Sequence, residues 1–187
     1  EFGVAGSFRG DPLPLVKCKT LDLEVPATAE IVLEGHVNPN PAEWKDEGPF
    51  GEFAGLIGPQ RLSWLFRARA ITHRRHPIMH SVFGAHLDHL YAHFAIEASI
   101  FQRVKQAVSG VKDICWLGSG GPFHLVISLK KRTEGEPMRA AMAALSASNF
   151  IKHVFVVDDD IDPGNTEEVM WAIATCCQAD SSITILN

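Results

Sequence analysis

The chain has 187 residues, of which 46% are hydrophobic and 21% are charged. This composition is typical of an ordinary globular protein and excludes a disordered, collagen-like or coiled-coil chain. The 17 basic and 22 acidic residues give a formal net charge of -5 and form no long block, so we expect no nucleic-acid partner. No apolar run approaches the roughly 20 residues that a transmembrane helix needs, so we expect no membrane partner and a cytoplasmic location.

Residues 1–80 are rich in turns and favour β-strands. Short apolar or alternating runs are separated by clusters of Gly, Pro and Asn, which is the pattern of strands joined by turns. These runs are residues 15–18, 29–34 and 65–72. In the last run Arg67 and Arg69 alternate with small or apolar residues, which predicts a strand with one solvent-exposed face.

From about residue 86 the hydrophobic period changes to that of a helix. The apolar residues that fall on one stripe are Leu87, Leu90, Tyr91, Phe94, Ala98, Phe101, Val104 and Val108. This stripe predicts one long amphipathic helix. Its apolar face must be covered, and we expect a homo-oligomer.

Strands and helices alternate in the rest of the chain. We predict strands at 113–117, 123–129 and 154–157, the last of them buried, and a helix over 137–149. Asn165 followed by Glu168 is typical of a helix N-terminus, so a last helix is expected there. Its inward residues would be Val169, Ile173 and Cys176.

These patterns together predict an α+β fold in two parts. A β-rich segment is expected over residues 1–82. A long linking helix and an α/β domain are expected over residues 83–187. The hinge between the two parts is predicted between His80 and His86.

The segment from Asp46 to Phe53, with the sequence DEGPFGEF, carries two glutamates. Its glycines and proline prevent a regular helix and weaken a strand, so the backbone must follow a special loop path. If Glu47 and Glu52 point into one partly closed site, mutual repulsion and desolvation raise the pKa of one carboxyl while the other stays ionised. Acid/base chemistry near neutral pH requires such a difference. From composition alone, an ordinary solvated turn is the simpler interpretation.

Histidine is concentrated in one stretch, since six of the nine histidines lie between His73 and His93. The polar stripe of the long helix consists of His86, His89, His93 and Glu97. A pair of histidines at i and i+4, such as His89 and His93, can chelate zinc. The alternative is a solvated or interface face. A metal-binding or assembly module built on His89 and His93 is therefore a second functional hypothesis.

Two further segments invite a ligand interpretation. The acidic run at 158–162 follows a predicted buried strand, where α/β folds commonly place ligands, and its carboxylates suit a divalent cation. The Pro163-Gly164-Asn165 sequence after it favours an ordinary turn into a helix.

Residues 118–121 are glycine-rich, but neither a helix start nor a Lys-Ser pair follows, so we predict a turn there.

An ordered set of motifs runs along the whole chain, at residues 1–10, 16–18, 25–27, 29–35, 47–52, 71–74, 158–162 and 169–172. In these motifs the chain resembles the UbiD-type decarboxylases. The EIVLEG strand followed by the EGPFGE loop is distinctive of that family. The resemblance implies a reversible, non-oxidative decarboxylase of aromatic or α,β-unsaturated acids that uses prenylated FMN. It also implies a split β-barrel-like cofactor domain, a linking helix and an α/β domain that forms homo-oligomers.

The resemblance assigns roles to three glutamates. Glu52 would be the acid/base group that protonates the carbon left when carbon dioxide departs, and Glu47 would be its partner carboxylate. Glu1 would be a ligand of a divalent metal, manganese or magnesium, held against the flavin phosphate. The family's catalytic arginine and its other metal ligands correspond to positions before Glu1. We therefore expect a piece of a longer enzyme, with no turnover by itself.

Overall fold

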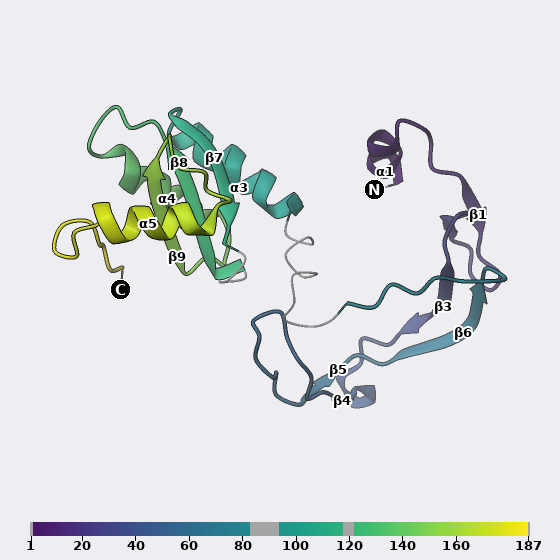
Figure 1. Cartoon of the computed structure of the whole chain (residues 1–187). Coiled ribbons are helices and arrows are strands. Elements are labelled where there is room, and N and C mark those ends of the chain that lie inside the picture. The colour runs from purple at the N-terminus through teal and green to yellow at the C-terminus, as the bar shows by residue number, and fades with distance from the viewer. Residues whose placement is uncertain (1, 83–93, 118–121, 187) are drawn as a thin grey trace. The chain divides into compact units, whose positions relative to one another are not determined.

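The computed structural model describes residues 2–82, 94–117 and 122–186 (Figure 1). Its contacts divide the chain into two compact units. The first unit comprises Glu1–Phe50 and Gly58–Ser81, and the second comprises Gly51–Ile57 and Val82–Asn187. Both units mix helices with small sheets, which confirms the α+β class at that level. Among the described residues no helix is long and apolar enough to cross a membrane.

Among its described residues, the first unit contains one helix and three antiparallel strand pairs. The helix is α1 (Phe2–Arg9), and a single 3-10 turn, η1, covers Pro41–Glu43. The pairs are β1 (Leu15–Lys17) with β2 (Glu24–Pro26), β3 (Ile31–Val37) with β6 (Phe66–His73), and β4 (Lys45–Glu47) with β5 (Arg61–Ser63). Because the described strands pair only two by two, the split barrel that the resemblance implies is not evident in them.

The alternation predicted for β6 is only partly present. Ala70 and Thr72 are half-buried, whereas Phe66, Arg67, Ala68 and Arg69 are all exposed. The prediction of one buried face was wrong for the first half of the strand, because among the described elements only β3, its neighbour in the sheet, contacts β6 extensively and no element covers that face extensively. The two strands shift register at Glu34/Gly35, where a Cβ on Gly35 would clash with the carbonyl oxygen of Arg67.

Glu34, on β3, is a buried acid that ties two segments together. It is only 3% exposed. Its carboxylate accepts hydrogen bonds from the Lys19 N–H at 2.7 Å, the Thr20 N–H at 2.6 Å and the Thr20 hydroxyl at 2.7 Å. The Lys19 N–H is the main reason that the pKa of Glu34 lies below its usual range, although desolvation opposes the shift. The carboxylate thus fastens the β1–β2 turn to β3.

We expect the stability of the first unit to fall in mild acid because of Glu34. The contribution of a carboxyl with a lowered folded-state pKa is complete above the unfolded value of about 4.3, and is lost as the pH falls from there through the folded value. Glu34→Gln removes this pH dependence and turns an amide NH2 toward N–H donors, so stability at neutral pH also drops. Urea unfolding at about pH 7 and about pH 3 measures both effects. An unchanged pH dependence in Glu34→Gln would contradict this assignment.

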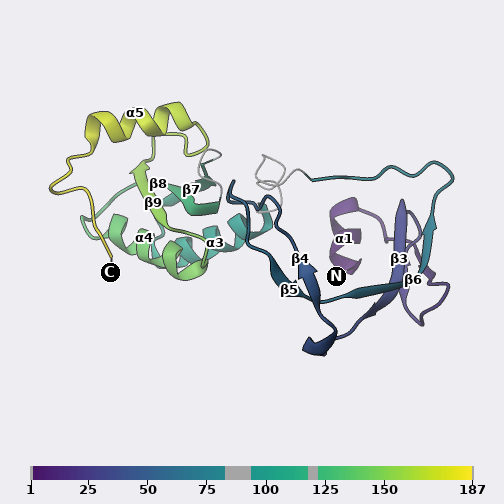
Figure 2. The ribbon, with the colours of Figure 1, turned by 90° about the horizontal axis from the view of Figure 1, so that it is seen from below.

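The second unit is a three-layer α/β arrangement (Figure 2). Its sheet has the order β7-β8-β9, with β7 (Val111–Trp116) antiparallel and β9 (His153–Asp158) parallel to the central β8 (His124–Leu129). Helices α3 (Phe94–Ala107) and α4 (Glu136–Ala147) cover one face, and α5 (Thr166–Cys176) covers the other. Strand β8 is therefore buried on both sides, which explains its unbroken apolar run. Strand β9, predicted as buried, is half-buried because it lies at the edge of the described sheet.

The described part of the predicted long helix is α3. Val104 is fully buried, and Val108, just beyond the last helical residue, is 2% exposed, so both predictions are confirmed. Ala98 was wrongly placed on the inward stripe, since it is exposed, and Ile100 is the residue that packs in the core. The stripe from Leu87 to Tyr91 lies outside the described residues.

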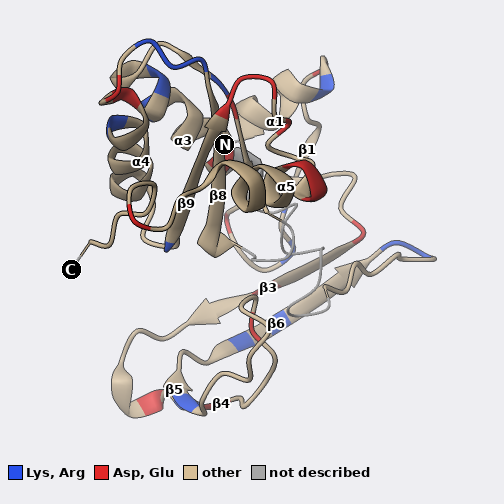
Figure 3. Ribbon diagram, turned by 60° about the vertical axis from the view of Figure 1, so that its left-hand side comes forward, with Lys and Arg blue, Asp and Glu red and all other residues tan. Residues whose placement is uncertain are grey.

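The N-terminus of α5 has the predicted cap. The Asn165 side-chain oxygen accepts from the N–H groups of Glu167 and Glu168, and its amide donates to the Glu168 carboxylate at 2.9 Å. Acidic residues thus gather where α5 begins (Figure 3). Val169 is buried and Ile173 is half-buried, as expected. Cys176 is exposed, contrary to expectation, because the small apolar cluster under α5 ends at Ile173.

Candidate active site

The predicted acid/base pair lies on the β4–β5 connection. Glu47 is the last residue of β4, and the chain then turns through Gly48, whose φ of +85° favours glycine. Glu52 lies in the following loop, where its N–H donates to the Leu56 carbonyl at 2.9 Å and its carbonyl accepts from the Gly55 N–H at 3.0 Å. The special loop path that the glycines and proline predicted is therefore present, and it restrains the backbone of Glu52 on both sides.

The two carboxylates have different surroundings. Glu47 is exposed, faces Arg61 across the strand pair, and places its Oε2 3.7 Å from the Arg61 Nε. Glu52 is half-buried, and among the described residues its carboxylate has no hydrogen-bond or ion-pair partner. One carboxylate is thus compensated by a cation, whereas no described residue pairs with the other. Sequence reasoning missed Arg61, because the register of β4 against β5 is what brings it opposite Glu47.

The structure describes none of the predicted metal ligands. Glu1 lies outside the described residues, and so do His86, His89 and His93. Glu97, the last member of the proposed polar stripe, is half-buried and accepts from the Trp116 N–H at 3.2 Å. Burial raises its pKa. Glu97 therefore packs against β7 and does not belong to an exposed polar face, which corrects that part of the prediction.

The acidic run at 158–162 lies in the turn before α5, and Asp162 makes hydrogen bonds within that turn and to α5. The Asp162 carboxylate accepts from the Gly164 N–H at 2.8 Å, and the Asp162 N–H donates to Glu168. No group of three or more His, Cys, Asp or Glu side chains that could hold a metal occurs within residues 2–82, 94–117 and 122–186. The turn interpretation accounts for the described contacts of this run. Residues 118–121 lie outside the described ranges.

Two further clusters escaped sequence reasoning. One is a pair of histidine rings at the starts of β8 and β9, His124 and His153, with centroids 4.8 Å apart. Desolvation is the main cause that lowers the pKa of His124, and the charge of His153 adds to it. The other is the surroundings of Cys115. Burial raises the pKa of its thiol to about 11, so this thiol is a poor nucleophile at neutral pH.

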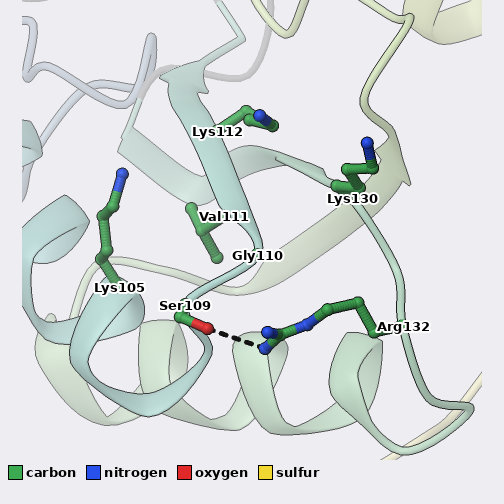
Figure 4. Close-up of a pocket in the computed structure, with 7 residues that line it drawn as sticks. All are labelled: Lys105, Ser109, Gly110, Val111, Lys112, Lys130 and Arg132. Carbon is green, nitrogen blue, oxygen red and sulfur yellow. Dashed lines mark hydrogen bonds between the residues drawn. The ribbon is translucent and has the colours of Figure 1, made fainter.

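A basic pocket of about 260 Å³ lies elsewhere in the second unit (Figure 4). Its lining residues are Lys105, Ser109, Gly110, Val111, Lys112, Lys130 and Arg132. Arg132 donates to the Ser109 hydroxyl at 2.7 Å and pairs with the buried Glu136 at 2.9 Å, so its charge is compensated. Neither Glu47 nor Glu52 lines this pocket. The basic run at 130–132 was its visible sequence signal.

Comparison with known protein families identifies the family of the chain that contains the Glu47–Glu52 loop. Residues 1–86 match the Rift-related domain of 3-octaprenyl-4-hydroxybenzoate carboxy-lyase, and residues 89–187 match the C-terminal domain of the same carboxy-lyase. The chain belongs to the UbiD family. This confirms the resemblance that the ordered motifs indicated.

Individual UbiD relatives support the same assignment. The anhydromevalonate phosphate decarboxylase of Methanothermobacter thermautotrophicus is 35% identical over 194 residues, which cover 100% of this chain and 44% of that enzyme. An evolved dimeric form of the UbiD-class enzyme HmfF from Pelotomaculum thermopropionicum, solved in complex with prFMN, is 42% identical with a TM-score of 0.92. That match covers 98% of this chain and 43% of the HmfF chain.

A third relative acts on an aromatic acid. The apo 3,4-dihydroxybenzoic acid decarboxylase AroY of Klebsiella pneumoniae has a TM-score of 0.90 at 30% identity, over 98% of this chain and 40% of its own. The chain therefore spans less than half the length of the relatives that it matches.

Proposed function

We propose that this chain is part of a reversible, non-oxidative carboxy-lyase for aromatic or α,β-unsaturated carboxylic acids, in which Glu52 is the acid/base residue. The observation that carries the proposal is the state of Glu52. Its side chain is half-buried and without a hydrogen-bond or ion-pair partner among the described residues, on a loop whose backbone is restrained. An acid/base group must be positioned in this way and still be able to reach a substrate atom.

The proton balance assigns a task to each glutamate. The bond between the substrate carbon and its carboxylate breaks, carbon dioxide departs, and the electron pair stays on the carbon. Protonated Glu52 donates its proton to that carbon and is left as a carboxylate, which solvent reprotonates. Glu47 is the proposed partner carboxylate, and Arg61 orients its side chain from the opposite strand. Prenylated FMN, when bound, supplies the stabilisation of the negative charge that develops on the carbon.

The described residues of the first unit fit the aromatic ring system of a flavin in part. Strand residues such as Leu33 and Ile71 are 57% and 62% exposed, which is unusual for apolar side chains on paired strands. The indole Nε1 of Trp44 is buried and has no partner among the described residues, so it is a donor available to a ligand or to further chain. We propose that sequence beyond this chain completes the flavin site and, with Glu1, the manganese or magnesium site.

We also propose that the second unit forms homo-oligomers and that a small acid is the substrate. The support is the dimeric form of the HmfF relative and the aromatic substrate of the AroY relative. Light scattering tests the assembly, since a monomer of about 20.5 kDa at micromolar concentration would contradict it.

A spectrum and a product assay test the proposed function itself. The full-length protein, produced with the prenylated flavin, should show visible flavin absorbance and release carbon dioxide from a panel of aromatic and α,β-unsaturated acids. Protein that binds no flavin, or that binds it and decarboxylates none of these acids, would contradict the proposal.

A further inference from the structure

The loop that carries Glu52 is anchored through the residue that follows it. Residues Gly51–Ile57 group with the second unit, although β4 and β5 on either side belong to the first. Within the second unit the Phe53 ring lies 5.9 Å from that of Phe123 and 5.4 Å from that of Phe150, and the latter pair meets edge to face at 83°. Phe53 is accordingly half-buried, whereas Leu56 in the same loop is 71% exposed.

The aromatic cluster is itself fixed to the sheet of the second unit. Phe123 directly precedes β8, and its carbonyl accepts from the Lys152 N–H at 2.9 Å. The Lys152 ammonium also lies 4.7 Å from the centroid of the Phe123 ring. Phe150 comes from the segment between α4 and β9. Phe53 therefore contacts aromatic rings from both segments that lead into neighbouring parallel strands.

We propose that Phe53 is a positioning residue that places the Glu52 carboxyl by packing its ring on Phe123 and Phe150. The proposal rests on the proposed role of Glu52 in proton transfer. Glu52 and Phe53 are adjacent, and the turn is closed by the Gly55 N–H to Glu52 carbonyl bond. The Phe53 ring thus restrains the loop through its side chain. This restraint adds to the hydrogen bonds that hold the backbone of Glu52, the proposed proton donor. Proton transfer is steeply sensitive to such placement.

Hydrogen exchange on this chain tests the anchor without any cofactor. Phe53→Ala and Phe150→Ala should each speed the exchange of the Glu52, Gly55 and Gly58 amides by about 2- to 10-fold, the range expected for losing an aromatic pair. The double variant should exchange no faster than the faster single variant, because both remove the same contact. Leu56→Ala, in the same loop, is the matched control and should leave these rates unchanged.

Two results would overturn the anchor. One is a Phe150→Ala variant in which these loop amides keep their original exchange rates. The other is a double variant whose effect equals the product of the single effects. Exchange of the β8 amides, recorded in the same experiment, identifies any variant that has lost its fold. In that case Phe53→Leu, which keeps much of the apolar volume and loses the ring, replaces Phe53→Ala.

Kinetics of the full-length, flavin-loaded enzyme test the positioning role. Phe53→Ala should lower kcat per bound flavin by roughly 10-fold or more while KM changes by less than about twofold, and Phe53→Tyr should restore most of the rate. If Glu52→Gln is inactive and Phe53→Ala keeps the original kcat in the same assay, the positioning role of Phe53 is wrong and the proposed role of Glu52 is unaffected. A Glu52→Gln enzyme that keeps its activity overturns the proposed function and the positioning role with it, whatever the exchange data show.

Discussion

Glu52→Gln is expected to lower kcat of the full-length, flavin-loaded enzyme by about 10²- to 10⁴-fold, the usual contribution of general acid/base catalysis. The substitution keeps the size of the side chain and removes the proton that we propose it transfers. The backbone bonds of Glu52 to Leu56 and Gly55 remain, so the loop should keep its path. Flavin content and thermal unfolding should match those of the original enzyme. Decarboxylation rates per bound flavin measure the effect.

Glu43→Gln is the matched control for this prediction. Glu43 lies outside the EGPFGE loop, and its carboxylate pairs with Arg67 at 3.1 Å on the surface of the same unit. Losing one exposed ion pair has little effect on stability, and the rate should stay within about twofold of the original. An activity of Glu52→Gln within about threefold of the original would remove Glu52 from the proton-transfer role.

Leu125→Ala should destabilise the second unit by about 2–5 kcal/mol, the usual range for a large-to-small change at a fully buried site. Leu125 is 0% exposed and lies on β8, the central strand of the sheet. Its side chain belongs to the core that α3 and α4 cover, so truncation leaves a cavity that rigid neighbours on both sides cannot fill. A loss of this size is a large part of the stability of a typical domain.

Urea unfolding of the chain, followed by circular dichroism, measures this loss of unfolding free energy in Leu125→Ala as a lower urea midpoint. Met170→Ala on α5 is the control, because Met170 is 53% exposed and its truncation opens no cavity. Its effect should stay within about 0.5 kcal/mol. A loss below about 1 kcal/mol for Leu125→Ala would mean that the core around β8 is less tightly packed than its burial indicates.

The elements of the second unit were largely predictable because their patterns are local. The expected strand over 123–129 became β8 (His124–Leu129), and the expected helix over 137–149 became α4 (Glu136–Ala147). The α5 cap depends on side chains only a few residues apart, so Asn165 and Glu168 sufficed to locate it. Periodicity and capping are properties of neighbouring residues, and a single sequence contains them.

The first unit was less predictable. Helix α1 (Phe2–Arg9) was missed, because Gly3 and Gly6 are poor helix formers. In the structure Gly6 is buried and packs against the backbone at Asp11 and Leu13, a close approach that local propensity does not indicate. The three separate strand pairs were also invisible in the sequence, since their partners are set by pairing between distant segments.

The sequence by itself indicated where the backbone must turn and which residues we propose carry the chemistry: Glu47 and Glu52, with glycines and a proline between them, are adjacent features that need no tertiary context. Only the tertiary structure decided what surrounds them. Arg61 faces Glu47 because β4 and β5 pair in one register, and Phe53 meets Phe150 because the loop packs against the segment that precedes β9. Such contacts join residues far apart along the chain, and the free energy that selects them comes from packing and strand pairing rather than from local preference.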